Sequence, residues 1–148
     1  KKIDDPKLKI SKNDILVLKN IGPKTVYGMP EAGYLPIPKK ILKTGVKDMI
    51  RISDGRMSGT AFGTIILHVA PESAIGGPFS ILKTGDKIKL SVKNKSLNVL
   101  ITKSEMQKRL RNVKIKAPTI KRGYLKLYYD TVLQADEGCD FDFLQYKK

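Results

Sequence analysis

The residues best suited to chemistry lie in one short stretch, 51–64, which is RISDGRMSGTAFGT. It combines glycines with hydroxyl, acidic and basic side chains, between two apolar runs where an ordinary turn would suffice. The candidate side chains are Ser53, Asp54, Arg56, Ser58 and Thr60. Two interpretations are open, a tight structural turn or a loop that faces a ligand, because glycine permits both unusual φ values and close backbone approach.

A second loop, 21–38, contains one further candidate, Glu31, among several prolines and glycines. This density of helix breakers predicts a long ordered loop. A single carboxylate can complete a magnesium site but seldom forms one alone. A serine without an adjacent basic side chain needs a metal or strong electrostatic help to act as a base. The two loops together therefore indicate half of a site, completed by a ligand, another subunit or further sequence.

Several common sites are excluded by their missing motifs. Neither loop contains the P-loop, the dinucleotide fingerprint or the G-x-S-x-G nucleophile elbow. The single histidine, His68, lies in the apolar run IILHVA, which favours a core residue over a catalytic base. The single cysteine, Cys139, can form neither an internal disulfide nor a cluster alone, and its acidic neighbours predict an unreactive thiol.

The composition is that of one domain. The chain has 148 residues, of which 41% are hydrophobic and few are aromatic, so a mostly aliphatic core is expected. No apolar run approaches the roughly 18 residues of a membrane span, and the N-terminal stretch lacks the apolar region of a signal peptide. We therefore expect a soluble, cytoplasmic protein with no membrane partner.

The net charge of +15 leaves nucleic-acid binding open as a second hypothesis. The densest basic stretch, Lys103 to Lys126, contains one acid, Glu105. Such a stretch is more often a solvated basic face than a phosphate-binding surface. The strands expected at 86–101 lack the interleaved aromatic residues that stack on bases, so nucleic acid is a disfavoured partner. A non-catalytic assembly module is a third hypothesis, weakened because Glu31 and Ser58 both lie in intact motifs.

The elements that must position these loops are mostly short strands. Apolar runs predict buried strands at 14–20, 46–52 and 63–70, and period-two alternation around Asn94-Lys95 predicts a hairpin at 86–101. Helices are predicted at 38–45, 102–112 and 123–133, the second from a capping box of Thr102 and Glu105. The tail, 136–148, is predicted to be an edge strand or an ordered terminus. The pattern indicates a β-rich α+β domain spanning 1–148, with a barrel-like sheet flanked by helices.

Three segments resemble a known family: VYGMPEAG, RISDGRMSGTAFGTIILHVAPESAIGGP and GDKI. They are similar to the C-terminal domain of the iron–sulfur dehydratases, which act on dihydroxy acids, phosphogluconate and sugar acids. The resemblance runs from about Ile3 to Leu144. The closing segment and the SGT after Arg56-Met57 look more like the sugar-acid (pentonate and hexonate) branch than the branched-chain amino-acid branch, which remains the alternative.

The resemblance implies a β-barrel similar to the swivelling domain of aconitase-type enzymes, and dehydration of a 2,3-dihydroxy carboxylate to a 2-keto acid. It also implies Mg²⁺ and an iron–sulfur cluster, held mainly by an N-terminal domain. Glu31 matches a glutamate that reaches the magnesium, Ser58 matches the base, proposed as an alkoxide, and Thr60 matches a hydroxyl residue near the substrate. For Asp54 and Arg56 two roles stay open: substrate binding, or contacts that hold Ser58 in place.

The chain departs from this family in what it lacks. The cluster cysteines and most magnesium ligands that the resemblance implies are not in this sequence. By the same resemblance, we expect that the first strands of the domain are missing too. We therefore expect a segment that is inactive alone and that requires the N-terminal dehydratase domain as a partner. An open sheet edge would also favour a homo-oligomer.

Overall fold

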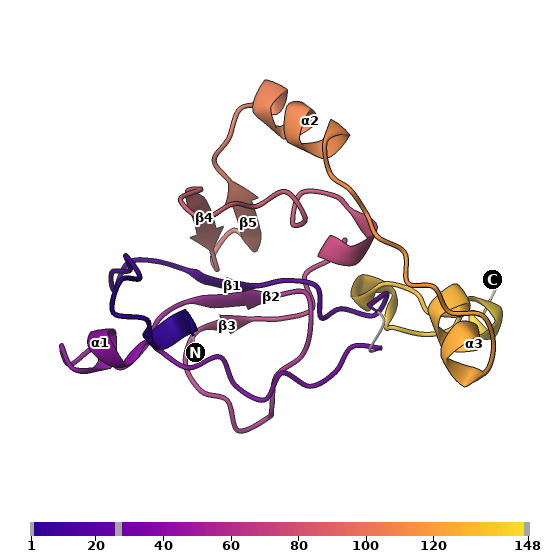
Figure 1. The fold of residues 1–148 in the computed structure, drawn as a ribbon, viewed down its shortest axis with the longest axis horizontal. Helices are drawn as coiled ribbons and strands as arrows, with labels where there is room; N and C mark the ends of the chain where they lie inside the picture. Colours follow the sequence, from indigo (N-terminus) through magenta and orange to yellow (C-terminus); the bar gives the residue numbers. More distant parts are fainter. Residues whose placement is uncertain (1, 26–27, 147–148) are drawn as a thin grey trace.

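The chain forms two small sheets (Figure 1). The structure is a computed structural model, and it describes residues 2–25 and 28–146. The parallel sheet has the order β1-β2-β3, and the second sheet is an antiparallel hairpin, β4-β5. The strands are β1 (Leu16–Leu18), β2 (Arg51–Ser53), β3 (Ile65–Ile66), β4 (Ile88–Ser91) and β5 (Ser96–Val99). The α+β class and the hairpin are confirmed.

The predicted barrel-like sheet is wrong, because the strands in the described part of the chain close into no barrel. A barrel requires continuous hydrogen bonding around all its strands, whereas these two sheets share no strand pairing. The strands predicted at 46–52 and 63–70 contribute only β2 and β3 to the parallel sheet. All three strands of this sheet are short, with two or three residues each.

The three predicted helices are present as α1 (Lys39–Leu42), α2 (Lys103–Arg111) and α3 (Tyr124–Thr131). The Thr102 hydroxyl caps α2 by accepting a hydrogen bond from the Glu105 N–H at 3.1 Å. The Glu105 carboxylate, however, accepts a hydrogen bond from Arg109 Nε at 2.7 Å. Only the first half of the predicted capping box is therefore observed. None of the helices described is long and apolar enough to cross a membrane.

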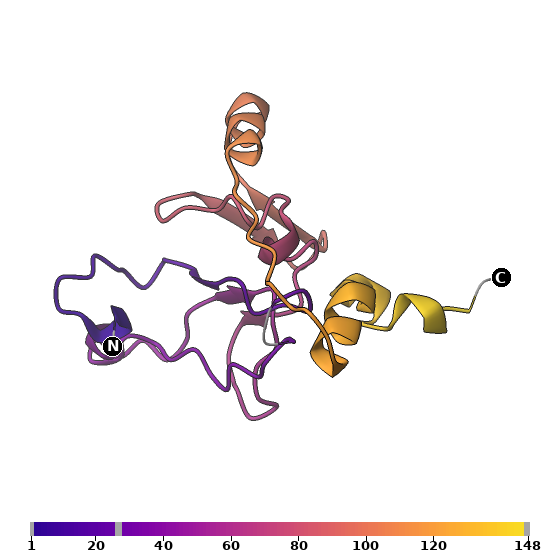
Figure 2. The same cartoon turned by 45° about the vertical axis from the view of Figure 1, so that its right-hand side comes forward.

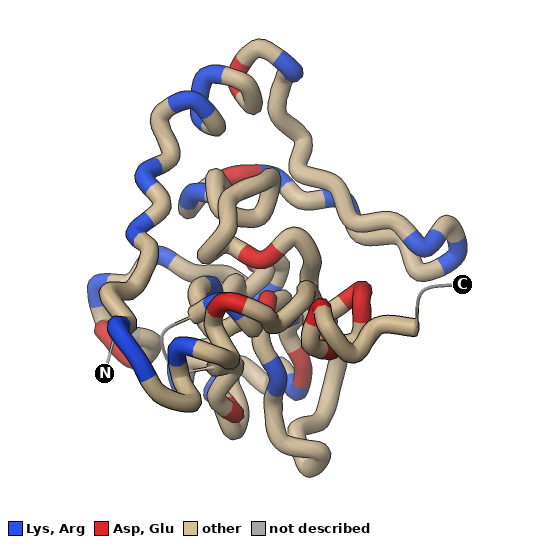
Figure 3. Tube along the Cα trace, turned by 90° about the vertical axis from the view of Figure 1, so that its right-hand side faces the viewer, with Lys and Arg blue, Asp and Glu red and all other residues tan. Residues whose placement is uncertain are grey.

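The later elements extend in two directions from the parallel sheet (Figure 2). The hairpin lies above this sheet, α2 lies beyond the hairpin, and α3 with the C-terminal segment lies to one side. Lys and Arg are distributed over several elements, including α2 and the hairpin tip (Figure 3). The buried hydrophobic residues are mainly aliphatic, as predicted, and one cluster comprises Ile37, Ile41 and Met49.

In the described part of the C-terminal segment, short 3-10 turns at Ala135–Glu137 and Asp142–Leu144 take the place of the predicted edge strand. It is tied to the body through Glu72, which is buried. Glu72 accepts hydrogen bonds from the Lys24 N–H at 2.7 Å and the Gln134 amide at 2.8 Å. Burial raises the pKa of Glu72, and these hydrogen bonds offset part of that effect. The tail therefore packs against the loop that leads to Glu31.

Candidate functional site

The two loops singled out in the sequence lie side by side and pair through their backbones. An isolated parallel bridge joins Glu31 to Arg56, and the Ala32 N–H donates to the Arg56 carbonyl at 3.1 Å. Two residues after Arg56, the Ser58 N–H donates to the Gly33 carbonyl at 2.7 Å. These contacts place Glu31 and Ser58, which are far apart in sequence, on two neighbouring segments that form one short ribbon.

Ser58 and Thr60 form a hydroxyl pair on this ribbon. Their oxygens are 3.0 Å apart, and the Thr60 N–H donates to Ser58 Oγ at 3.3 Å. Ser58 is half-buried, whereas Thr60 is exposed. Two donors can thus point at one serine oxygen, and hydrogen bonds to the charged form of a group favour that form. The arrangement suits a hydroxyl that carries negative charge during a reaction.

Glu31 and Arg56 are both exposed beside this pair. Arg56 Nε donates to the Met29 carbonyl at 3.2 Å, so part of its guanidinium is used to hold the neighbouring loop. Met29 has a left-handed φ of 52°, an uncommon conformation for a side-chain-bearing residue. The cross-loop contact therefore stabilises the turn immediately before Glu31.

Asp54 is fully buried at the end of β2, and its carboxylate is surrounded by donors. It accepts hydrogen bonds from the backbone N–H groups of Asn20 at 3.0 Å and Ile21 at 3.2 Å. The N–H of Ser73, at 2.9 Å, and the Ser73 hydroxyl also donate to it. This geometry favours the structural role for Asp54, because its oxygens are occupied by the protein. The neighbouring Ser53 is buried too, and its hydroxyl accepts from the Gly55 N–H at 3.0 Å.

His68 is not the core residue that its apolar run predicted. It is exposed, has a left-handed φ of 55°, and its N–H donates to the Gly55 carbonyl at 3.2 Å. The strand β3 ends at Ile66, so the alternation of buried side chains no longer applies at His68. The backbone of His68 therefore supports the site loop while its side chain faces solvent.

The described residues of this chain supply only some of the ligands that a metal ion needs. Among residues 2–25 and 28–146 no group of three or more His, Cys, Asp or Glu side chains could hold a metal ion. Mg²⁺ takes about six oxygen ligands, so Glu31 fits one ligand position. The set does not fit an iron–sulfur cluster, since the single thiol, Cys139, lies 4.0 Å from the Met29 sulfur and burial raises its pKa.

Sequence reasoning missed the residue that underlies both loops, Arg51 in β2. Its side chain is fully buried, and its guanidinium contacts Tyr34 from the first loop and Phe62 from the second. A charged residue inside an apolar strand was the available signal, because charged side chains are almost never fully buried unless paired.

Comparison with known proteins identifies the family of this chain. Residues 1–139 match the family described as dihydroxy-acid/6-phosphogluconate dehydratase C-terminal. The chain is 51% identical over 148 residues to L-arabonate dehydratase of Azospirillum brasilense, covering 96% of this chain and 25% of that protein. It is 49% identical over 143 residues to 6-deoxy-6-sulfo-D-gluconate dehydratase of Pseudomonas putida, covering 97% of this chain and 25% of that protein.

A relative named for dihydroxy acids is less similar. Dihydroxy-acid dehydratase of Acetivibrio thermocellus is 42% identical over 131 residues, covering 88% of this chain and 23% of that protein. The chain thus spans about a quarter of the length of the curated relatives it matches. With the match over residues 1–139, the chain belongs to the dihydroxy-acid/6-phosphogluconate dehydratase family, as a C-terminal domain.

Proposed function

We propose that this chain is the part of a sugar-acid dehydratase that supplies the base. The full-length enzyme would convert a 2,3-dihydroxy carboxylate into a 2-keto-3-deoxy acid. The observation that carries the proposal is the ribbon that holds Ser58, Thr60 and Glu31 together. The higher identity to enzymes named for arabonate and sulfogluconate supports a sugar acid over a branched-chain dihydroxy acid, which remains the alternative.

In this reaction Ser58 Oγ, as the alkoxide, takes the proton from C2 of the substrate. The C2–H electron pair forms the C2–C3 double bond as the C3 hydroxyl departs as hydroxide, which gives an enol that tautomerises to the 2-keto acid. The Thr60 N–H and hydroxyl, which both reach Ser58 Oγ, would stabilise the alkoxide before proton transfer. Arg56, exposed on the same ribbon, is a candidate to bind the substrate carboxylate.

Glu31 would serve as one ligand of a bound Mg²⁺. When bound, the magnesium and an iron–sulfur cluster would act as Lewis acids toward the enolate charge and the departing hydroxide. The further ligands would come from an N-terminal dehydratase domain, consistent with relatives about four times as long as this chain. The resemblance to the swivelling domain of aconitase-type enzymes and the expected homo-oligomer belong to the same proposal.

The test is Ser58→Ala in a full-length dehydratase that carries this chain. We expect the variant to keep its metal content and to lose about 10³-fold in kcat on sugar acids, the usual contribution of a general base. Ser104→Ala is a matched control, because Ser104 is exposed on α2 and should leave turnover unchanged. Normal turnover in Ser58→Ala would remove the base assignment.

A further inference from the structure

Arg51 is a buried charge placed directly beneath the site. Its side chain has 0% exposure in the central strand β2, although removing a cation from water costs several kcal/mol. Arg51 Nη2 donates to the Tyr34 hydroxyl at 2.7 Å, and Nη1 donates to the Phe62 carbonyl at 3.0 Å. The guanidinium also stacks 4.8 Å from the centroid of the Tyr34 ring. Its contacts therefore go mainly to neutral groups of the two loops.

These contacts hold the site ribbon from both sides. Tyr34 directly follows Gly33, whose carbonyl accepts the Ser58 N–H, and Phe62 lies two residues after Thr60. The rings of Tyr34 and Phe62 are stacked, with centroids 5.5 Å apart and planes inclined by 20°. A single guanidinium thus connects the strand that leads to Ser58 with the loops on either side of it.

Asp48 closes the same network where the loop returns to the sheet. It lies 3.3 Å from Arg51 Nη1 and accepts hydrogen bonds from the Thr64 N–H and hydroxyl, both at 2.8 Å. Thr64 immediately precedes β3, and its carbonyl accepts the Arg51 N–H at 3.0 Å. The segment 58–64 is therefore fixed at its start by Gly33 and at its end by Arg51 and Asp48.

We propose that Arg51 is a positioning residue that sets the placement of the Ser58–Thr60 hydroxyl pair. The proposal rests on the proposed function, in which Ser58 is the base. Arg51 acts through Tyr34 and Phe62 and does not itself face the substrate, since its side chain is buried. The effect of losing it is large because a misplacement of about 1 Å at reacting groups can cost roughly 10²-fold in rate.

The test uses Arg51→Lys in the full-length dehydratase, because lysine keeps the charge but lacks the planar fork. We expect kcat to fall by roughly 10- to 100-fold with KM changed by less than about threefold, since the orientation of the base is altered and not the binding of substrate. The rise of kcat with pH should also shift to higher pH, because Thr60 would stabilise the alkoxide less well. Amide hydrogen exchange in peptides covering 55–64 should accelerate by about tenfold or more.

The matched control is Arg109→Lys, which alters an arginine that is also held by carboxylates but lies on α2. It should speed exchange in α2 and leave kcat, its pH profile and exchange over 55–64 unchanged. If Arg51→Lys does not fold, Tyr34→Phe tests the same link, because it removes only the hydroxyl that accepts from Arg51. A roughly three- to tenfold loss in kcat, with faster exchange over 55–64, is then expected.

Two results would overturn the proposal. The first is that folded Arg51→Lys has the same kcat and the same pH profile as the parent enzyme. Where Tyr34→Phe is used because Arg51→Lys does not fold, the same result for Tyr34→Phe counts. The second is unchanged exchange over 55–64 in that variant. The failure of the proposed function has a different signature. The parent enzyme would then fail to dehydrate sugar acids, or Ser58→Ala would turn them over normally. In that case the exchange measurement still decides whether Arg51 holds the loop.

Discussion

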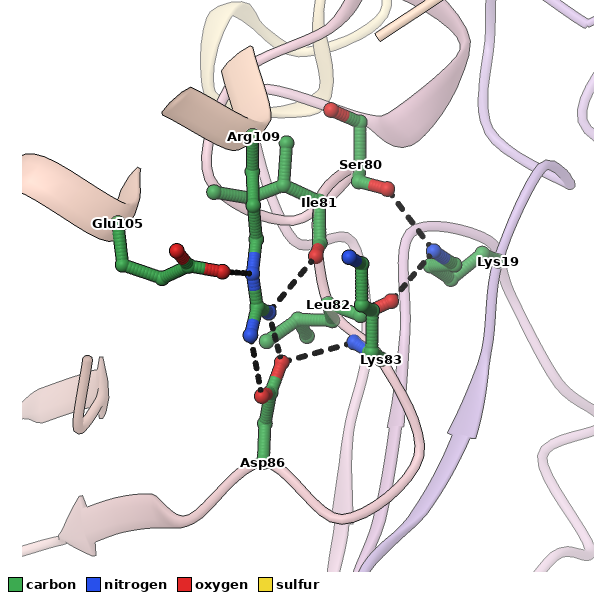
Figure 4. Close-up of polar contacts among 8 residues, drawn as sticks. All are labelled: Lys19, Ser80, Ile81, Leu82, Lys83, Asp86, Glu105 and Arg109. Carbon is green, nitrogen blue, oxygen red and sulfur yellow. Dashed lines mark hydrogen bonds and ion pairs between the residues drawn. The ribbon is translucent and has the colours of Figure 1, made fainter. Parts of the chain in front are cut away.

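Arg51 and Arg109 each pair with an aspartate, yet they hold two very different regions of the molecule. Arg109 binds Asp86 through two hydrogen bonds of 2.5 and 3.0 Å and Glu105 through a third of 2.7 Å, which anchors α2 to the loop before the hairpin (Figure 4). Lys19 reinforces that loop by donating to the carbonyls of Ser80 and Leu82. Arg51 instead has a carbonyl, a hydroxyl and one aspartate as partners.

The difference lies in burial and in what each network supports. The side chain of Arg109 is 13% exposed, and two carboxylates, those of Asp86 and Glu105, accept its hydrogen bonds. The side chain of Arg51 is fully buried, and its Nε has no hydrogen-bond partner. Breaking a buried pair costs far more than breaking one near the surface. The Arg109 network attaches a peripheral helix, and the Arg51 network shapes the loop that contains the candidate base. The less complete network is therefore the one at the site.

The largest expected effect comes from Gly63→Ala, which breaks the Arg51 network directly. Gly63 has a φ of 95°, and an added Cβ would lie 2.2 Å from Asp48 Oδ1 and 3.0 Å from Arg51 Nη1. We expect a loss of about 3 kcal/mol or more in the free energy of unfolding, from the clash together with the backbone strain. Urea-dependent hydrogen exchange, followed on peptides from this domain in the full-length enzyme, measures it.

Gly45→Ala is the control for backbone strain alone. Gly45 has a φ of 83°, but nothing lies within 4 Å of an added Cβ. The expected loss is about 1 kcal/mol, the usual penalty for a left-handed alanine. Equal losses at Gly63 and Gly45 would show that the contacts with Asp48 and Arg51 add little, and the contrast between the two regions would weaken.

A smaller effect is expected from Asp54→Asn, which tests whether Asp54 binds substrate or supports the site. An asparagine offers one oxygen in place of two, so part of the set of donors around Asp54 loses its acceptor. We expect a loss of about 2 kcal/mol in the free energy of unfolding with KM nearly unchanged. A large increase in KM without loss of stability would instead assign Asp54 to the substrate.

The smallest effect is expected at the α2 anchor and depends on pH. The hydrogen bond from Arg109 holds the pKa of Asp86 below its ordinary value. A carboxylate with a lowered pKa contributes stability above its unfolded pKa, and this stability is lost as pH falls through the folded pKa. The protection of α2 amides in the parent enzyme relative to Asp86→Asn should therefore be full at neutral pH and should decline as the pH falls below about 4.

Comparing the two proteins at the same pH cancels the intrinsic pH dependence of exchange. Exchange over 55–64 should show no difference between them, because the Arg109 network does not contact the site loop. A difference in exchange over 55–64 would mean that the α2 anchor and the site loop are coupled, and the two arginine networks would then not be independent.

Local signals in the sequence predicted the elements well where they depend on neighbours along the chain. The alternation at 86–101 predicted the hairpin, and the capping-box spacing of Thr102 and Glu105 predicted α2, because both patterns are set within a few residues. The barrel was wrong because sheet closure depends on pairings between distant strands, which the run of apolar residues leaves open. The prediction that His68 is a core residue was wrong because β3 ends at Ile66, and the apolar run alone does not show where the strand ends.

The sequence by itself determined the chemistry available to this protein: a serine, a threonine and a single glutamate in two glycine-rich loops. Only the tertiary structure decided that these loops pair, that Asp54 is buried among backbone donors, and that Arg51 lies beneath them. The physical reason is that hydrogen bonds between distant segments depend on where the chain packs. Residue types and spacing determine which groups can react, and packing determines which of them meet.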